Sequence, residues 1–205
     1  KQRRLIRIGA PIGGQWTLEM LSFAIFLVFV ARFGDVAMAA SQAFMALLSL
    51  SFMQASGLGI AVATLIGRYI GSGQLDAAEK SFRSGMVLAF LIAGSLALLF
   101  LLVPDQLIRI FSDDPEVIRM GSSILLIGAA LQFFDTFGIV ADGALHGAGD
   151  TRVPFLARFV LAWVFFLPLA WYFAFHLEGG LVGAWIASAI HLFLLAIYLI
   201  WRFQS

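Results

Sequence analysis

Six long apolar stretches dominate this sequence and restrict the folds that it can adopt. A helix needs about 20 mostly apolar residues to cross the hydrocarbon core of a bilayer. The stretches of that length cover residues 8–30, 36–66, 85–103, 117–145, 155–175 and 180–201. Inside a bilayer the backbone must satisfy its own hydrogen bonds, which favours helices. The sequence therefore predicts an all-α, polytopic membrane protein whose residues 1–205 form a single domain with six transmembrane helices.

The composition agrees with a membrane protein. Hydrophobic residues make up 61% of the chain and charged residues only 12%, whereas soluble domains carry about 25% charged residues. Cysteine is absent, which excludes disulfides, thiolate metal sites and a cysteine nucleophile. The chain begins with Lys1 rather than methionine, and no signal peptide precedes the first apolar stretch. We therefore expect it to begin inside a longer parent protein.

Charged residues are distributed unevenly between the two sides of the predicted helices. With six crossings, one side receives most of the basic residues of the chain: Lys1, Arg3, Arg4, Arg7, Arg68, Lys80, Arg83, Arg152, Arg158 and Arg202. The other side mixes both signs: Arg32, Arg109, Arg119, Asp35, Asp105, Asp113, Asp114, Glu116 and Glu178. By the positive-inside rule, this pattern predicts a multi-pass protein of the cell (cytoplasmic or inner) membrane with both termini of the segment in the cytoplasm.

Short polar segments predict where the helices begin. Asp76 and Glu79 have the spacing of a capping box ahead of the third apolar stretch. Asp114 before Pro115 fits an N-cap followed by proline at the first helical position. Residues 104–111 are too few and too polar to span a bilayer, and they predict a helix lying in the outer interface.

Glycines one helical turn apart predict close contacts between helices. The pairs with this spacing are Gly9 and Gly13, Gly67 and Gly71, and Gly143 and Gly147. Such small residues let the backbones of neighbouring membrane helices approach each other closely.

Three carboxylates lie inside predicted spans, where ionisable side chains are rare and usually functional. Glu19 falls near mid-membrane in the first span, and Asp135 falls in the middle to inner half of the fourth. Asp142 is seven residues, or about two turns, further along the same face. Gln15 and Gln132 each precede an acid by about one turn and are candidate accessory residues.

The sequence suggests no countercharge for Glu19 and Asp135. No lysine or arginine lies in the cores of their spans, so we expect no internal salt bridge. The two acids are then either protonated at rest or separated by a mobile cation. Hard cations prefer carboxylate oxygens, by extension from Ca²⁺ and Mg²⁺, so both acids would be metal ligands if the ion is Na⁺. H⁺ stays equally open, and Asp142 either meets cytoplasmic water or takes part in ion entry.

Other chemistries lack the residues they need. No pair among His146, His176 and His191 has metal-ligand spacing, and we expect these side chains in a turn or near helix ends. Serines such as Ser22 and Ser188 have no evident base partner. We therefore predict no catalytic residue, no enzymatic activity and no cofactor besides a coupling ion.

The segment Gly-Ala-Leu-His-Gly-Ala-Gly-Asp-Thr-Arg-Val-Pro at residues 143–154 resembles the signature that closes the fourth helix of a lobe in the multidrug and toxic compound extrusion (MATE) family. Supporting stretches are PIGGQWTLE at residues 11–19, GLGIA at 57–61, GRYIGSG at 67–73 and FFDTF at 133–137. The resemblance covers nearly the whole chain. It implies one six-helix lobe, the C-terminal one, of a twelve-helix transporter with a central cavity.

The resemblance also implies a function. Such a lobe is half of a cation-coupled antiporter that exports organic, often cationic, compounds, and the matching acids of the C-terminal lobe bind the coupling cation. This role carries over to Glu19 and Asp135. Some members have a tyrosine where this chain has Leu131, and Asp142 replaces a small or neutral residue. The expected partners are the N-terminal six-helix lobe of the same parent chain, small organic substrates and the lipid bilayer, but no nucleic acid.

Alternatives to the antiporter differ in the residues that they require. A lipid-linked precursor flippase of the same superfamily would need cationic residues facing an anionic headgroup, and none lies in mid-span. An intramembrane hydrolase would need both acids within reach of one water molecule, with further convergent polar groups. A purely structural subunit would leave two unpaired acids in the membrane at high cost.

Overall fold

The computed structural model describes residues 2–204, including the side chains of residues 13, 14 and 17–204. This part of the chain is helical and contains no strand. The uninterrupted α-helices are α1 (Gln2–Ala31), α2 (Asp35–Gly71), α3 (Leu75–Leu102), α4 (Pro104–Arg109), α5 (Pro115–Gly147) and α8 (Gly180–Gln204). One further helical segment consists of α6 (Arg152–Val160), η1 (Leu161–Phe166), α7 (Leu167–Trp171) and η2 (Tyr172–His176).

The predicted spans coincide with these helices. Five segments of the described chain are long and apolar enough to cross a membrane, and α1 adds the shorter apolar helix Thr17–Ala31. In the segment Arg152–His176, the wider π-helical turn η1 comes just before Pro168. Proline has no N–H to offer to the preceding turn, which accounts for a departure from α-helical hydrogen bonding at this point.

One of the two predicted helix caps is confirmed and the other is wrong. The N-cap at Asp114 is confirmed, because its carboxylate accepts a hydrogen bond of 2.9 Å from the N–H of Glu116. The capping box at Asp76 is wrong. Helix α3 begins at Leu75 without a side-chain cap, and Glu79 instead forms an ion pair of 2.6 Å with Arg83. The i, i+4 partner one turn further along competes successfully for the Glu79 carboxylate.

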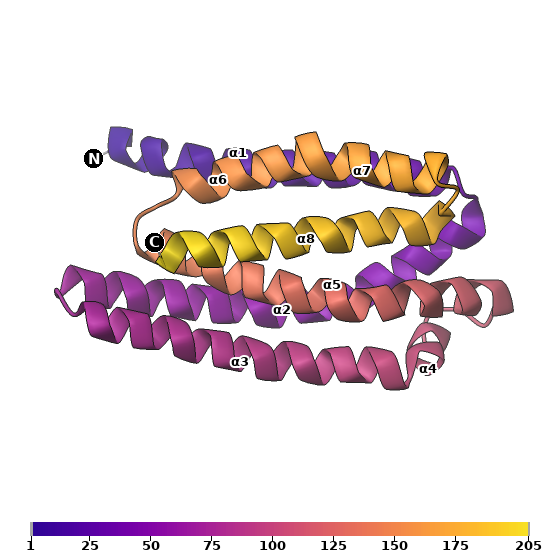
Figure 1. The fold of residues 1–205 in the computed structure, drawn as a ribbon, viewed down its shortest axis with the longest axis horizontal. Coiled ribbons are helices and arrows are strands. Elements are labelled where there is room, and N and C mark those ends of the chain that lie inside the picture. Colours follow the sequence, from indigo (N-terminus) through magenta and orange to yellow (C-terminus); the bar gives the residue numbers. More distant parts are fainter. Residues whose placement is uncertain (1, 205) are drawn as a thin grey trace.

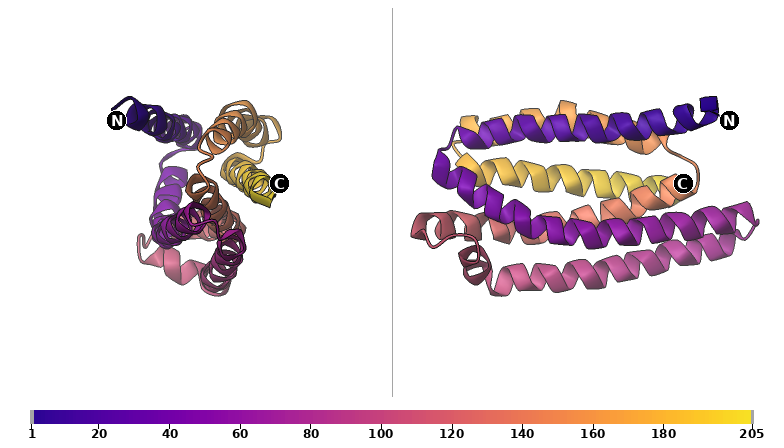
Figure 2. Two further views of the ribbon diagram at one scale, coloured as in Figure 1. Left: turned by 90° about the vertical axis from the view of Figure 1, so that its left-hand side faces the viewer. Right: turned by 180° about the vertical axis from the view of Figure 1, so that it is seen from behind.

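Helix α5 lies at the centre of the bundle (Figure 1) and packs against α2, α3, α4 and α8. The end-on view in Figure 2 shows α1 and α6 at one edge and α3 at the opposite edge. Buried residues of α5 include Ile124, Leu131, Val140 and Ala144, which point in different directions around the helix. A helix that is apolar all round is buried on all sides, and this explains why the chain wraps around α5.

Glycines bring α2 and α5 into backbone contact. A Cβ atom on Gly143 would overlap the carbonyl oxygen of Gly59, and one on Gly147 would overlap that of Ala63. A Cβ on Gly67 would lie 3.2 Å from the carbonyl oxygen of Gly147. The close contacts predicted for Gly67, Gly143 and Gly147 are therefore confirmed. Those predicted for Gly13 and Gly71 are wrong, because a Cβ at either position would meet nothing of the described chain within 4 Å.

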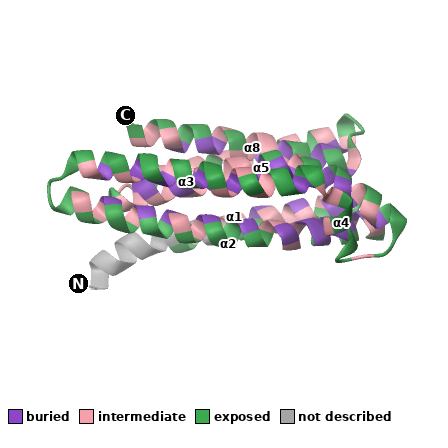
Figure 3. Ribbon diagram, turned by 90° about the horizontal axis from the view of Figure 1, so that it is seen from below, coloured by how far each residue is buried: buried purple, intermediate pink, exposed green. Residues whose placement is uncertain are grey.

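Aromatic side chains fill the core toward the other end of the bundle. The Trp185 ring packs edge-on against Phe26 and Phe44, with centroid distances of 4.9 and 4.7 Å. Its indole N–H donates a hydrogen bond of 3.3 Å to the Ser41 hydroxyl. The outer helix faces are exposed (Figure 3) and carry many apolar side chains, including Val87 and Leu91 of α3. A bilayer accommodates such a surface, whereas water disfavours it.

Charged residues lie at both ends of the bundle. The start of α1 and the end of α8 lie at the same end of the bundle (Figure 1), together with the α2–α3 turn and the α5–α6 loop. Arg68 and Arg152 belong to that end, whereas Asp113 lies in the α4–α5 loop at the other. The short helix α4 is confirmed, and it packs into the bundle through the fully buried Ile108.

The contact between α2 and α5 predicts a position-specific effect of added volume. Gly143→Val should destabilise the fold by about 1–3 kcal/mol because the side chain must push two backbones apart. Gly57→Val is the matched control, since a Cβ at Gly57 meets nothing within 4 Å. Thermal unfolding midpoints in detergent would measure both changes. Equal shifts for the two variants would contradict this account of the contact.

Candidate functional site

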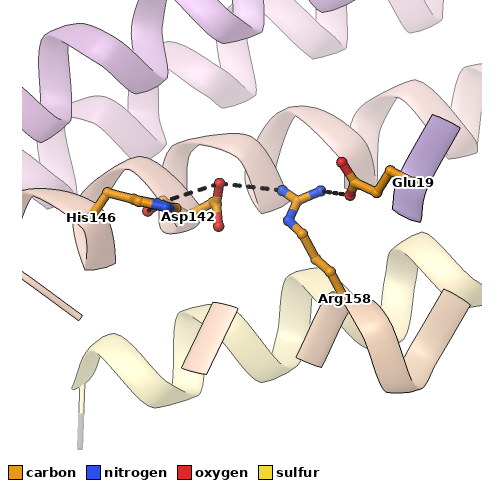
Figure 4. A network of polar contacts seen from close by, with 4 residues as sticks. All are labelled: Glu19, Asp142, His146 and Arg158. Carbon is orange, nitrogen blue, oxygen red and sulfur yellow. Dashed lines mark hydrogen bonds and ion pairs between the residues drawn. The ribbon is translucent and has the colours of Figure 1, made fainter. Parts of the chain in front are cut away.

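A buried guanidinium joins two of the three membrane acids (Figure 4). Arg158 of α6 points into the bundle, and only 12% of its side chain is exposed. Its Nη1 donates a hydrogen bond of 2.6 Å to Oε1 of Glu19 on α1. Its Nη2 lies 3.5 Å from Oδ2 of Asp142 on α5. One arginine thus links carboxylates from two helices that lie on either side of it.

The expectation that Glu19 would have no internal salt bridge is therefore wrong. The charge pattern predicts that Arg158 flanks the fifth span, but it lies six residues after the first residue of α6, Arg152. Six residues correspond to about 9 Å of helix, and a long arginine side chain can carry its charged head further from its own Cα. Apolar residues on both sides of it, in the sequence FLARFVL, were the available signal.

Asp142 belongs to this network. Its side chain is 18% exposed, and its Oδ1 atom is buried without a hydrogen-bond partner among the described residues. His146 follows one turn later, with Nδ1 2.8 Å from the backbone oxygen of Asp142 and 3.6 Å from its Oδ2. This arrangement does not fit the alternative in which the Asp142 carboxylate simply meets cytoplasmic water at the helix end.

Asp135 contributes charge to the same cluster. It is partly buried on α5, and the charges of Arg158 and Glu19 act on it. Within the described chain, the ion pairs of Arg158 are made with Glu19 and Asp142, not with Asp135. The structure therefore brings the three acids into one electrostatic cluster. Glu19 and Asp142 are both paired with Arg158, whereas Asp135 is not.

His191 was expected near a helix end, and this is wrong. It lies in the middle of α8, with its ring 5.2 Å from that of Phe166. It interacts with the backbone of Leu161 and with the charge of Arg158, and its Nδ1 is buried without a hydrogen-bond partner in the described part of the chain. Helix α8 begins at Gly180, so His191 does not lie near the start of its helix. Packing against η1 determines the surroundings of this histidine.

The two glutamines differ in what the structure describes. The side chain of Gln15 lies outside the described residues. Gln132 is 2% exposed, and its Nε2 donates a hydrogen bond of 2.7 Å to the backbone oxygen of Ala93 on α3. This bond ties α5 to α3. Leu131 is part of the buried apolar core.

A narrow crevice leads past the ion pair between α1 and the segment that begins with α6. Glu19 and Arg158 line it together with Leu18, Phe155 and Trp163. The indole Nε1 of Trp163 is buried without a hydrogen-bond partner among the described residues. A buried polar atom of this kind normally has a partner, but the crevice has a volume of about 10 Å³, which is barely enough for one water molecule.

The cluster is suited to binding a positive charge. Glu19 and Asp142 pair with one guanidinium, and Asp135 lies within reach of its charge, so negative charge is in excess when all three acids are ionised. Uncompensated charge at membrane depth is costly, and a bound cation or proton removes part of it. The described residues hold no group of three or more His, Cys, Asp or Glu side chains placed to enclose a metal ion.

Comparisons with known proteins agree on one family. The family model described as MatE matches residues 11–172. The chain is similar to a probable multidrug resistance protein NorM of Pseudomonas putida, with 34% identity over 98% of this chain and 45% of that protein. It is also similar to multidrug resistance protein MdtK of Edwardsiella ictaluri, with 30% identity over 98% of this chain and 45% of that protein. The chain thus spans less than half the length of these relatives.

Solved structures share the fold. A multidrug resistance MATE family transporter of the MOP superfamily in an outward-facing conformation superposes with a TM-score of 0.89 and 21% identity, over 96% of this chain and 44% of that chain. A MOP superfamily transporter from Pyrococcus furiosus gives the same TM-score and identity, over 96% of this chain and 43% of that chain. The chain therefore has the fold of one six-helix lobe of a twelve-helix transporter.

The hydrogen bond of Gln132 yields a prediction. Gln132→Ala removes an interhelical hydrogen bond and the packing of a buried side chain, and it should lower the free energy of unfolding by about 1–3 kcal/mol. Gln54→Ala on the exposed side of α2 is the control and should change it little. Thermal unfolding in detergent would compare them. A Gln132 variant as stable as the control would show that the bond to α3 is unimportant.

Proposed function

Because the chain belongs to the MatE family of transporters, we propose that it forms the C-terminal lobe of a cation-coupled antiporter that exports organic, often cationic, compounds. The observation that carries this proposal is the cluster of three membrane-embedded acids around Arg158. Its relatives' names, which refer to multidrug resistance, support the substrate class.

The cluster has the properties that ion coupling requires. An antiporter needs a site whose charge changes when the ion binds, placed where that change alters contacts between helices. Glu19 is on α1, Asp135 and Asp142 are on α5, and Arg158 is on α6. Neutralising a carboxylate here changes the attraction between helices rather than only within one helix. We assign the coupling-cation site to Glu19 and Asp135, with Asp142 as an accessory acid.

Exchange follows from this arrangement. Binding of Na⁺ or H⁺ at Glu19 and Asp135 weakens the hold of Glu19 on Arg158 and shifts α1 relative to α6, while the organic compound leaves outward. Loss of the ion restores the pair of 2.6 Å. A ligand shifts such an equilibrium only if it binds one state better than the other, and the acid cluster provides that difference.

A single lobe supplies only part of the walls of a central cavity. The relatives are more than twice as long as the matched region, which supports an N-terminal six-helix lobe as the partner. We place the protein in the cell membrane with both termini of this segment in the cytoplasm. The basic residues at the end where α1 starts and α8 finishes support that orientation.

The alternatives are weaker in light of the structure. Arg158 is a cationic residue inside a span, which a flippase for an anionic lipid headgroup would require, but Glu19 and Asp142 already neutralise it. Family membership places the chain among transporters rather than enzymes. This membership argues against an intramembrane hydrolase.

Neutralising either of the two assigned acids should weaken coupling strongly. In the full-length protein, Glu19→Gln and Asp135→Asn should each lower ion-driven drug efflux by about tenfold or more, within the range of typical coupling energies. Efflux of a fluorescent cationic dye from cells or vesicles would measure this effect. Glu79→Gln, which removes an exposed carboxylate on α3, is the control. Undiminished coupled efflux in both acid variants would refute the assignment.

A further inference from the structure

We propose that Arg158 is an ion-selectivity residue that excludes Na⁺ from the acid cluster, so that the coupled ion is a proton. The inference rests on the proposed function, because it identifies the ion used at that site. It begins from the position of the guanidinium, which lies between Glu19 and Asp142, 2.6 and 3.5 Å from their oxygens. A bound metal ion would also lie between carboxylates, so Arg158 already occupies the position that such an ion would take.

A fixed positive charge disfavours a second one nearby. Arg158 is always charged, and at 12% exposure its charge is little screened by water. A Na⁺ ion entering between the carboxylates would approach the guanidinium to within a few ångströms. It would also compete with an arginine that donates a short, charge-assisted hydrogen bond to Glu19.

With Glu19 and Asp142 paired to Arg158, a metal ion would find few free carboxylate oxygens in the cluster. Hard cations are held by about six oxygen ligands, and no group of three or more His, Cys, Asp or Glu side chains in the described chain is placed to hold one. A proton needs a single oxygen atom. The buried Oδ1 of Asp142, which has no hydrogen-bond partner among the described residues, is one such atom.

The surrounding helices keep the cluster attractive to positive charge despite the arginine. The charged and titratable groups around Arg158 are Glu19 from α1, Asp135, Asp142 and His146 from α5, and His191 from α8. The three carboxylates outnumber the single guanidinium. The cluster therefore attracts positive charge, while the position of Arg158 between Glu19 and Asp142 disfavours a metal ion there, and a proton meets both conditions.

Sodium binding tests the role of Arg158 directly. Binding of radiolabelled Na⁺ to the purified full-length protein would be compared between the wild type and variants. Arg158→Gln should raise the affinity for Na⁺ about tenfold or more, whereas Arg158→Lys keeps the charge and should leave it low. Arg83→Gln, which removes an exposed arginine of α3, is the control and should behave as the wild type. Equal Na⁺ affinity in the wild type and Arg158→Gln would overturn the proposal.

Should Arg158→Gln fail to fold, the double variant Arg158→Gln with Asp142→Asn removes one charge of each sign. Glu19 and Asp135 remain in it, and the double variant should show the same gain in Na⁺ affinity. A folded double variant without that gain would overturn the proposal.

Transport separates this proposal from the proposed function. With ethidium as the probe in vesicles carrying the full-length protein, a pH gradient alone should drive transport by the wild type and a Na⁺ gradient alone should not. Wild-type transport driven by Na⁺ alone would refute the selectivity role. If neither gradient drives ethidium, the antiport function itself fails, while the Na⁺-binding comparison still decides what Arg158 does.

Discussion

A charged side chain inside a bilayer must find its opposite charge within the protein, and in this chain that requirement is met at Arg158. The guanidinium connects Glu19 of α1 with Asp142 of α5 from its own position on α6. In the absence of bulk water, breaking such a pair leaves uncompensated charge, which is far more costly than losing a pair at the surface. The interaction therefore links helices and also makes their arrangement sensitive to the state of the acids.

The remaining fold supports this link by packing closely around α5. Its backbone touches that of α2 at Gly143 and Gly147, and Gln132 binds it to α3. The acids on α5 thus stand on a well-packed helix, whereas Glu19 stands on α1 at the edge of the bundle. A site divided between a central and a peripheral helix is suited to converting a change of charge into relative motion.

Much of the fold was predictable because the hydrocarbon core imposes a length and an apolar composition on each span. The glycines that bring α2 and α5 together were also identifiable, since small residues at helical spacing allow close approach. Predictions that depended on competition between local contacts were less successful. Glu79 matches the spacing of a capping box but pairs with Arg83, and nothing in the linear spacing decides between the two partners.

The sequence by itself determined that this is a helical membrane protein with costly acids at Glu19, Asp135 and Asp142, because hydropathy and the cost of burying charge are properties of each segment alone. Only the tertiary structure decided which of these acids have a partner. Arg158 is 139 residues away from Glu19 along the chain, and its distance from Glu19 depends on how α1 and α6 pack. A salt bridge between helices is set by their packing, and packing is not encoded in the hydropathy of either helix.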